Sequence, residues 1–361
     1  MSNISNHTEF AQVYGTNNVD IIDNFGYGAA VYAFGSSDLI RNFYAAYSTV
    51  QGNTGDDIIF NFSEYSVIDG GEADDYIGNS AANVTILGGS GNDTVLSDEN
   101  LVLVNIIGGD GEDSVTNISS WSTVDGGADD DTLRNYYASN VVVNGGDGED
   151  NLSNYGEHVT LSGGSDNDTV VNYSSNVYIN GGDNDDSIYS AVNLIYINID
   201  GGSGNDTIQN FSSWSTLKGG SGKDYIRTSL ASNLWIEGNE DDDVIENYAA
   251  NSTINGGSGD DYIGVYGDNT TIIYYKNQGS DTVFRGYSNG YPTSNTTVYF
   301  PDASIDDIQS ISGNTGIYFN NSSAITFSNS FNGGNSDFDK TTFRFSNGDE
   351  YFYSEGSLER K

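Results

Sequence analysis

Cysteine is absent from this chain of 361 residues, proline occurs only twice, and Lys and Arg together number 11 against 52 Asp and Glu. The lack of cysteine excludes a disulfide scaffold and a thiolate metal site. With only two His, a His-rich zinc site is not expected either. The formal net charge of −41 excludes nucleic acid and anionic membrane surfaces as natural partners, because both are bound through basic patches.

Long apolar runs are also missing, and no cleaved leader is expected from the first residues. No 18-residue apolar stretch is present, so we expect no membrane span. Residues 1–10 lack the basic start and apolar run of a cleaved secretory signal. Export would therefore need a different secretion signal. The 26 Tyr and 16 Phe argue against disorder. An acidic chain of this composition is expected to fold together with cations.

What the sequence contains is an internal repeat. The motif Gly-Gly-x-Gly-x-Asp-x-aliphatic, whose positions we number one to eight, recurs 15 times at steps of 18 to 20 residues. Good copies include GGSGNDTV at 88–95 and GGDGEDSV at 108–115, whereas the first two copies, at 15–22 and 33–40, are degenerate. The glycines at positions one, two and four are expected to permit backbone angles with φ > 0.

The step lengths themselves repeat, so the chain divides into blocks of 93 residues. Three five-turn blocks can be superposed, the last of them incomplete. Arg41, Arg134 and Arg227 then become equivalent, and Ser-Ser-Trp-Ser-Thr at 119–123 coincides with the same residues at 212–216. Duplication of a block accounts for this pattern.

Two apolar positions per turn predict a parallel β-solenoid. One lies two residues after each position-six Asp and the other two residues before each position-one residue, as in Ile77 and Ile68. Two short strands of this kind bury their apolar faces only when turns stack. We therefore predict an all-β chain with a β-roll of about 15 turns over residues 13–284. Residues 1–12 form a short preceding segment, and residues 285–361 form a small β-rich cap.

The side of the roll opposite the Gly/Asp turns is expected to be structural. Asn commonly stands four residues after the Asp, and an aromatic residue often follows it, as in Asn42 and Phe43. Stacking in register predicts an Asn hydrogen-bond ladder and an aromatic stack. A ligand-binding aromatic stripe is the alternative.

The position-six aspartates are the candidate metal ligands. Stacked turns place them about 4.8 Å apart, which is repulsive without cations. Calcium suits such a column of carboxylates and turn carbonyls because it accepts six to eight oxygen ligands in flexible geometry. A metal-free turn ladder is the alternative. The predicted ligands are Asp57, Asp75, Asp93, Asp113, Asp131, Asp150, Asp168, Asp186, Asp206, Asp224, Asp243, Asp261 and Asp281, with Asp20 and Asp38 as weaker candidates.

These motifs resemble the hemolysin-type calcium-binding nonapeptide of the RTX (repeats-in-toxin) family over roughly residues 15–283. The resemblance implies a right-handed parallel β-roll that folds in extracellular calcium, and type I secretion with an uncleaved C-terminal signal. This chain carries the nonapeptide in only one half of each turn, so a single column of up to about 14 Ca²⁺ is expected. The resemblance further implies that coordination is completed by the carbonyls of Gly89, Gly91, Gly109, Gly111, Gly146, Gly148, Gly202, Gly204, Gly220, Gly222, Gly257 and Gly259.

The two ends of the chain carry separate expectations. The register is lost from about Arg285, and residues 341–353 predict a hairpin with an Asn-Gly turn. This C-terminal region is expected to cap the solenoid, to act as a secretion signal, or both. The N-terminal end is barely capped, which predicts self-association end to end or laterally.

No catalytic constellation is evident, so we do not expect an enzyme. The arginines at 41, 134 and 227 are expected to face neighbouring acids, although a substrate row on a glycan-active face is an alternative. The favoured function is a secreted, calcium-stiffened structural protein of a cell surface, matrix or adhesin. The alternatives are a calcium-folding secretion module of a toxin or exoenzyme, and a solenoid that binds ice or a carbohydrate such as a cell-surface glycan.

Overall fold

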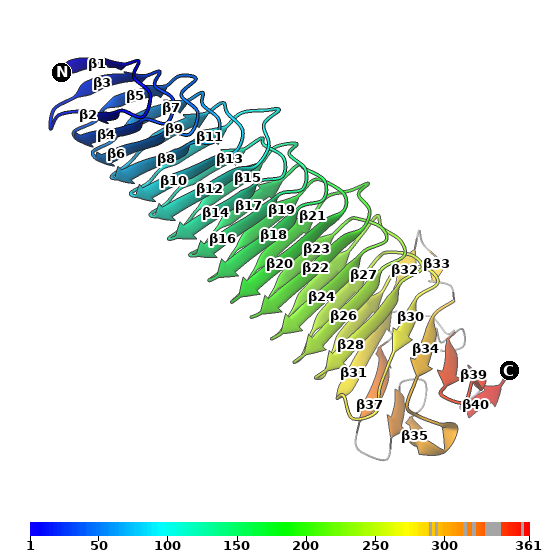
Figure 1. Cartoon of the computed structure of the whole chain (residues 1–361). Coiled ribbons are helices and arrows are strands. Elements are labelled where there is room, and N and C mark those ends of the chain that lie inside the picture. The colour runs from blue at the N-terminus through cyan, green and yellow to red at the C-terminus, as the bar shows by residue number, and fades with distance from the viewer. Residues whose placement is uncertain (289–290, 293–294, 313–315, 320–322, 329–340, 355–356) are drawn as a thin grey trace. The chain divides into compact units, whose positions relative to one another are not determined.

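The computed structural model describes residues 1–288, 291–292, 295–312, 316–319, 323–328, 341–354 and 357–361. Within these residues the regular structure is β-strand apart from one short 3-10 turn, η1 (Ile305–Asp307), and no helix is long and apolar enough to cross a membrane. The chain divides into two compact units, Met1–Gly182 and Asp183–Lys361. Each unit is a stack of parallel two-strand turns (Figure 1), and the described strands amount to about 16 turns in all. The predicted all-β parallel solenoid is confirmed.

Unit 1 pairs its strands in two parallel sheets, with one strand per turn in each sheet. The first sheet begins directly after the Gly/Asp turn, and the second sheet leads into that turn. The first sheet contains β1 (Ser2–Asn6), β3 (Asp20–Asn24), β5 (Leu39–Asn42), β7 (Ile58–Asn61), β9 (Tyr76–Asn79), β11 (Thr94–Ser97), β13 (Ser114–Asn117), β15 (Thr132–Asn135), β17 (Asn151–Asn154) and β19 (Thr169–Asn172). The second contains β2 (Gln12–Tyr14), β4 (Ala30–Gly35), β6 (Thr49–Thr54), β8 (Val67–Glu72), β10 (Val84–Ser90), β12 (Val104–Asp110), β14 (Thr123–Ala128), β16 (Val142–Asp147), β18 (Thr160–Ser165) and β20 (Val177–Asp183).

Unit 2 repeats this arrangement. Its first sheet contains β21 (Ser187–Ser190), β23 (Thr207–Asn210), β25 (Tyr225–Thr228), β27 (Val244–Asn247), β29 (Tyr262–Val265) and β31 (Ser280–Arg285). Its second sheet contains β22 (Ile197–Ser203), β24 (Thr216–Ser221), β26 (Trp235–Glu240), β28 (Thr253–Ser258), β30 (Thr271–Ile273) and β34 (Thr297–Phe300).

Parallel pairing extends further at both ends than the sequence predicts. At the N-terminal end, β1 already pairs with β3, so part of the expected preceding segment forms a turn of its own. Beyond residue 285, β37 (Ala324–Ser328) pairs parallel with β31, and β38 (Thr342–Phe345) pairs parallel with β34. These later strands follow no repeat, so periodicity could not find them.

The antiparallel part at the C-terminus is small, and some of it lies outside the described residues. β35 (Ile308–Ser312), β36 (Gly316–Phe319) and β37 form one antiparallel group. β38, β39 (Glu350–Ser354) and β40 (Ser357–Arg360) form another, and β32 (Tyr287–Ser288) pairs with β33 (Tyr291–Pro292). The predicted hairpin is confirmed: β38 and β39 are joined through Asn347 and Gly348, whose φ is +86°.

The core consists of the two apolar positions per turn that the repeat predicts. All 30 side chains of these two series are buried, including Ile68 and Ile77, which are fully inaccessible. Each contributes about 1.5–3 kcal/mol of transfer free energy. In the C-terminal part of unit 2 the buried aliphatic residues give way to phenylalanines, and Phe319 and Phe345 both pack against Phe300. The solenoid core is therefore thin, continuous within each unit, and covered by aromatic rings where the repeat ends.

The predicted Asn ladder and aromatic stack are also present at the corner that follows the first sheet. The side-chain amide of Asn24 donates to Asn42 at 2.8 Å, and that of Asn42 donates to Asn61 at 2.9 Å. Phe43 stacks on the ring of Phe25 at 5.1 Å and on that of Phe62 at 5.2 Å. The Asn ladder is interrupted where Ser97 takes the Asn position and bonds to a second serine, and it resumes where Asn117 donates to Asn135 at 3.1 Å. These side-chain bonds and ring stacks join neighbouring turns and so help to fix the stacking register.

Candidate cation-binding column

The Gly/Asp turn uses its glycines for two different reasons. Positions two and four have positive φ, as in Gly89 at +126° and Gly91 at +121°. Position one does not, which corrects the expectation that all three glycines permit φ > 0. A Cβ on Gly88 would instead collide with Asp93 Oδ2 and with the carbonyl oxygen of Gly108 in the next turn. The position-one glycine therefore leaves room for two oxygens.

Position four tolerates residues other than glycine in the left-handed region. Asp129, Asp166, Asn184 and Asp241 have φ between 72° and 76°, as expected for residues with short polar side chains. Ala73, which lacks such a side chain, is held at 83°. The turn geometry is thus imposed by the stack and not by the local sequence alone.

The position-six aspartates form a buried column in each unit. Asp57, Asp75 and Asp93 are at most 2% exposed, and all of the equivalent residues are buried. One oxygen of each carboxylate is held by the backbone of the preceding turn. The Asp57 N–H donates to Asp75 Oδ1 at 2.7 Å, and the Asp75 N–H donates to Asp93 Oδ1 at 2.7 Å. Unit 2 repeats the contact, with the Asp206 N–H donating to Asp224 Oδ1 at 2.8 Å.

The second oxygen of these carboxylates is buried without a hydrogen-bond donor. Within the described chain this holds for Oδ2 of Asp38, Asp57, Asp75, Asp93, Asp113, Asp131 and Asp150 in unit 1, and of Asp206, Asp224, Asp243 and Asp261 in unit 2. A buried, unpaired carboxylate oxygen costs several kcal/mol unless a proton or a cation compensates it. Its repetition on successive turns makes this column the candidate site.

Electrostatics confirms that the column is costly in the charged state. Burial raises the pKa of Asp57 to about 7 and that of Asp75 to about 8, and neighbouring carboxylates add to both shifts. The hydrogen bond from the preceding N–H opposes the rise without cancelling it. Asp243 in unit 2 behaves in the same way, with its pKa raised to about 8.

Asp20, at the start of unit 1, differs from the other members of the column. Its Oδ2 accepts hydrogen bonds from the Thr16 N–H at 2.6 Å and the Thr16 hydroxyl at 2.9 Å. Burial favours a higher pKa for Asp20, but the hydrogen bonds from Thr16 and Ser2 outweigh it and lower the pKa. Of the two weaker candidates, Asp20 is therefore satisfied by the protein, whereas Asp38 has the unpaired Oδ2 of the regular copies.

The carbonyl groups fall into two sets. The carbonyls at positions two and four, including Gly89 and Gly91, point toward the equivalent residues of the next turn, where only a glycine or a left-handed residue fits. The carbonyl at position one points back toward the preceding turn. There it lies beside Oδ2 of the Asp of that preceding turn. Sequence reasoning missed the position-one carbonyls, of which Gly88 and Gly108 are examples.

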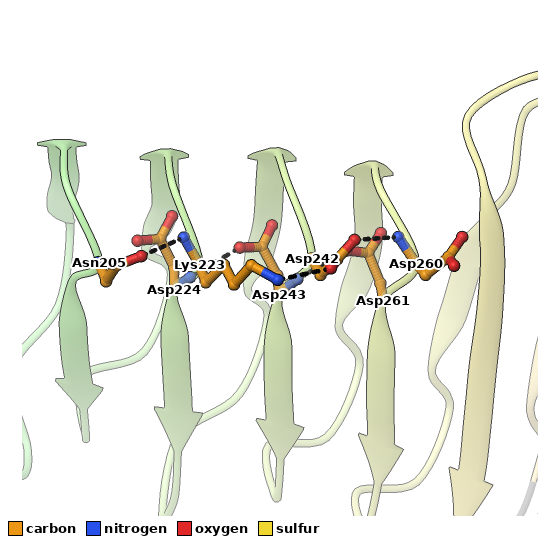
Figure 2. A network of polar contacts seen from close by, with 7 residues as sticks. All are labelled: Asn205, Lys223, Asp224, Asp242, Asp243, Asp260 and Asp261. Atoms are coloured by element: carbon orange, nitrogen blue, oxygen red, sulfur yellow. Dashed lines mark hydrogen bonds and ion pairs between the residues drawn. The ribbon is translucent and has the colours of Figure 1, made fainter.

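A second, exposed column of side chains lies beside the buried one. In several turns the position-five residue donates its N–H to an Asp or Asn side chain at position five of the turn before it. Figure 2 shows this in unit 2, where the Lys223 N–H donates to Asn205 Oδ1 at 2.9 Å and the Asp260 N–H donates to Asp242 Oδ1 at 2.8 Å. The Lys223 ammonium forms an ion pair with Asp242 at 2.7 Å. Asp and Asn are frequent at position five of the motif, and this pattern could have predicted the exposed column.

No cluster of three or more His, Cys, Asp or Glu side chains suited to a metal is found in the part of the chain that the structure describes. A cation in the buried column would therefore take most of its ligands from backbone carbonyls. The donor set is entirely oxygen, the unpaired Oδ2 atoms supply negative charge, and position-one carbonyls lie beside them. This chemistry fits a hard divalent cation such as Ca²⁺.

Two of the three arginines that were expected to face acids, Arg41 and Arg227, form ion pairs with acidic side chains. Arg41 donates to both carboxylate oxygens of Asp23, at 2.6 and 2.9 Å, and Arg227 lies 3.9 Å from Glu246. Both partners belong to neighbouring turns, so these charges link successive turns of the first sheet.

A comparison with models of known protein families finds no match, and a comparison with curated proteins finds none either.

Proposed function

We propose that the chain is a secreted structural protein whose solenoid is held together by calcium in the buried aspartate column. The observation that carries this proposal is the repeated Oδ2 atom, buried and without a donor on turn after turn of both units. The position-six aspartates would hold the ions, together with turn carbonyls. Bound calcium would supply the positive charge that the column lacks.

The choice of calcium rests on ligand chemistry and charge. All available donors are oxygens, which suits Ca²⁺ and Mg²⁺ better than zinc or copper. Calcium accepts carbonyls and carboxylates at variable geometry, whereas magnesium demands a near-ideal octahedron and retains its waters. One ion in each of about 14 gaps would offset most of the net charge of −41.

The proposed location follows from the same reasoning. Millimolar dissociation constants are typical of extracellular calcium modules, so a site built mainly from carbonyls suits an environment rich in calcium. The resemblance to RTX proteins adds secretion without a cleaved N-terminal signal, with residues 285–361 as a cap, a secretion signal or both. A structural, non-enzymatic role in a surface layer, matrix or adhesin agrees with a chain occupied almost entirely by solenoid.

The test is a comparison of the purified chain in excess chelator and in millimolar CaCl₂ at neutral pH. Circular dichroism would follow strand content, sedimentation velocity would follow compactness, and elemental analysis would count bound ions. We expect an expanded chain in chelator that becomes compact in calcium with several ions bound, while MgCl₂ has a much smaller effect. A compact chain in chelator with no bound calcium would refute the proposal.

A further inference from the structure

The corner that follows the first sheet holds one left-handed residue in most turns. We call this series the corner row. Its members have φ between 53° and 63°, and they are Phe10, Tyr47, Tyr65, Asn83, Leu103, Trp121, Asn140, His158 and Asn176 in unit 1, and Tyr196, Trp214, Asn233, Asn251, Asn269 and Asn295 in unit 2. Asn suits this backbone conformation, whereas a bulky residue there is a genuine outlier. Trp at this position is therefore retained against a conformational cost of about 1–2 kcal/mol.

Packing does not explain the two tryptophans of the corner row. Trp121 is 62% exposed and Trp214 is 57% exposed. Among the described residues neither indole has a contact with another aromatic ring. Their backbones are well held, since the Trp121 N–H donates to the Ser139 carbonyl at 3.0 Å and the Trp214 N–H donates to the Ser232 carbonyl at 2.9 Å. Each unit thus presents a rigidly mounted indole to solvent.

A serine hydroxyl accompanies each indole. Ser120 Oγ accepts the Ser139 N–H at 3.1 Å, and Ser213 Oγ accepts the Ser232 N–H at 3.0 Å. No acceptor for either hydroxyl hydrogen occurs in the described part of the chain, so each hydroxyl can donate to a ligand. The pair of Ser and Trp belongs to the pentapeptide Ser-Ser-Trp-Ser-Thr, which is identical at 119–123 and 212–216.

We propose that Trp121 and Trp214 are stacking platforms for the sugar rings of a neutral polysaccharide, with Ser120 and Ser213 donating to sugar hydroxyls. A flat indole offers a large apolar face at low entropic cost, and sugar rings combine apolar faces with hydroxyls at their edges. The net charge of −41 disfavours polyanionic glycans, nucleic acid and acidic proteins. One platform lies in each unit, so each is proposed as a separate binding site. The inference does not depend on which cation fills the aspartate column.

The test uses the full chain in calcium and the substitutions Trp121→Asn and Trp214→Asn. Asn is the residue that other turns carry in the corner row, so the fold is expected to be kept or slightly stabilised. The matched control is Trp235→Thr, because Trp235 is partly exposed on β26 and pairs in register with Thr216 and Thr253. Binding would be measured to cellulose, chitin, mannan and a soluble neutral glucan, with alginate as the anionic comparison.

We expect the wild type and Trp235→Thr to bind at least one neutral polysaccharide and not alginate. Each single Trp→Asn substitution should remove one of the two sites and so lower the amount bound at saturation by about half, and the double variant should reach the alginate level. Titration should also shift the tryptophan fluorescence of the wild type. Absence of binding by the wild type, or undiminished binding by the double variant, would overturn the proposal. A fall in melting temperature on Trp→Asn would instead show that the indoles are structural. A wild-type oligomer dissolved by the double variant would show that the partner is a second copy of the chain.

Discussion

At the scale of the residue, the Gly/Asp turn shows that one motif can need the same amino acid for unrelated reasons. Gly89 and Gly91 are needed for their backbone angles, whereas Gly88 is needed for the space that its missing Cβ leaves. The degenerate second copy has Ala33 at position one, and it is one of the two copies expected to bind calcium weakly. A methyl group at this position should therefore disturb the carboxylate as well as the fold.

The first prediction concerns Gly88→Ala. Its Cβ would collide with Asp93 Oδ2 and the Gly108 carbonyl, so we expect a loss of about 1–3 kcal/mol in the free energy of unfolding in calcium. Gly35→Ala is the control, because a Cβ there meets only the Thr54 hydroxyl, at 3.3 Å. Urea denaturation and ion counting would be measured for both. Equal midpoints for the two variants would contradict the steric role of Gly88.

The second prediction concerns Asp93→Asn, which removes a buried charge while keeping the oxygen that accepts the Asp75 N–H. In chelator the equilibrium between the expanded and the compact chain should shift toward the compact state by about 1–2 kcal/mol, because an unpaired buried carboxylate is lost. In calcium it should be less stable and bind fewer ions. This reversal of sign is specific to a metal ligand.

Asp74→Asn provides the control for that experiment. Asp74 lies in the exposed column and accepts the Asn92 N–H at 2.8 Å, a contact that an Asn side chain can also make. We expect a change within about 0.5 kcal/mol in either condition. If Asp93→Asn also left both conditions unchanged, the buried column would not be the calcium site.

At the scale of the element, most carboxyl groups of the aspartate column have similarly raised pKa values. This leads to a third prediction, on pH. Burial raises the folded-state pKa of Asp57, Asp93 and Asp131 to about 7, 6 and 8, whereas the unfolded value is near 3.9. Between these limits the folded chain binds more protons than the unfolded chain. The free energy of unfolding in chelator must therefore fall as the pH rises from about 4 to about 8.

Calcium should reverse this trend. Ions bind the ionised carboxylates, so in excess calcium the stability should rise with pH over the same range. The fraction of compact chain in chelator, followed by sedimentation velocity, and the denaturant midpoint in calcium, each at several pH values, would measure both trends. Stability that rises with pH in chelator would show that the carboxylates already have cationic or donor partners in the protein.

Periodicity explains which elements could be predicted. The alternation in Val67–Glu72 and Tyr76–Asn79 predicts one inward side chain on each strand, and the structure buries Ile68 and Ile77 as expected. The Asn ladder was equally predictable, because in-register stacking of identical amides leaves little choice of partner. Both features depend only on the repeat and on burial.

What escaped prediction depends on backbone direction or on irregular sequence. The exposed column is built from N–H donors that exist whatever the side chain, so Asn92, Glu112 and Lys223 donate alike. The position-one carbonyl lies beside the carboxylate because of strand geometry, which a motif does not reveal. The pairing of β34 with β38 joins segments about 40 residues apart that share no repeat. Such contacts follow from the folded backbone and not from sequence pattern.

At the scale of the whole molecule, the net charge of −41 arises from two populations of acids that respond differently to salt. Residues such as Asp242 and Asp260 are exposed, so their charges repel one another through water. Buried residues such as Asp243 and Asp261 repel one another through protein, where mobile ions do not reach. Salt at about 1 M shortens the screening length to about 3 Å, but only for the exposed charges.

The fourth prediction follows from that difference. In chelator at neutral pH, about 1 M NaCl should leave the chain expanded, because screening relieves only the exposed acids. Millimolar CaCl₂ at low ionic strength should compact it, because ions that enter the column neutralise the buried acids as well. Sedimentation velocity of the wild type would compare the two conditions, with Asp242→Asn as a control that lowers exposed charge and should change neither result. Full compaction by NaCl alone would mean that general charge repulsion, and not an unfilled oxygen site, keeps the chain unfolded. The aspartate column would then need only protons or diffuse counterions to fold.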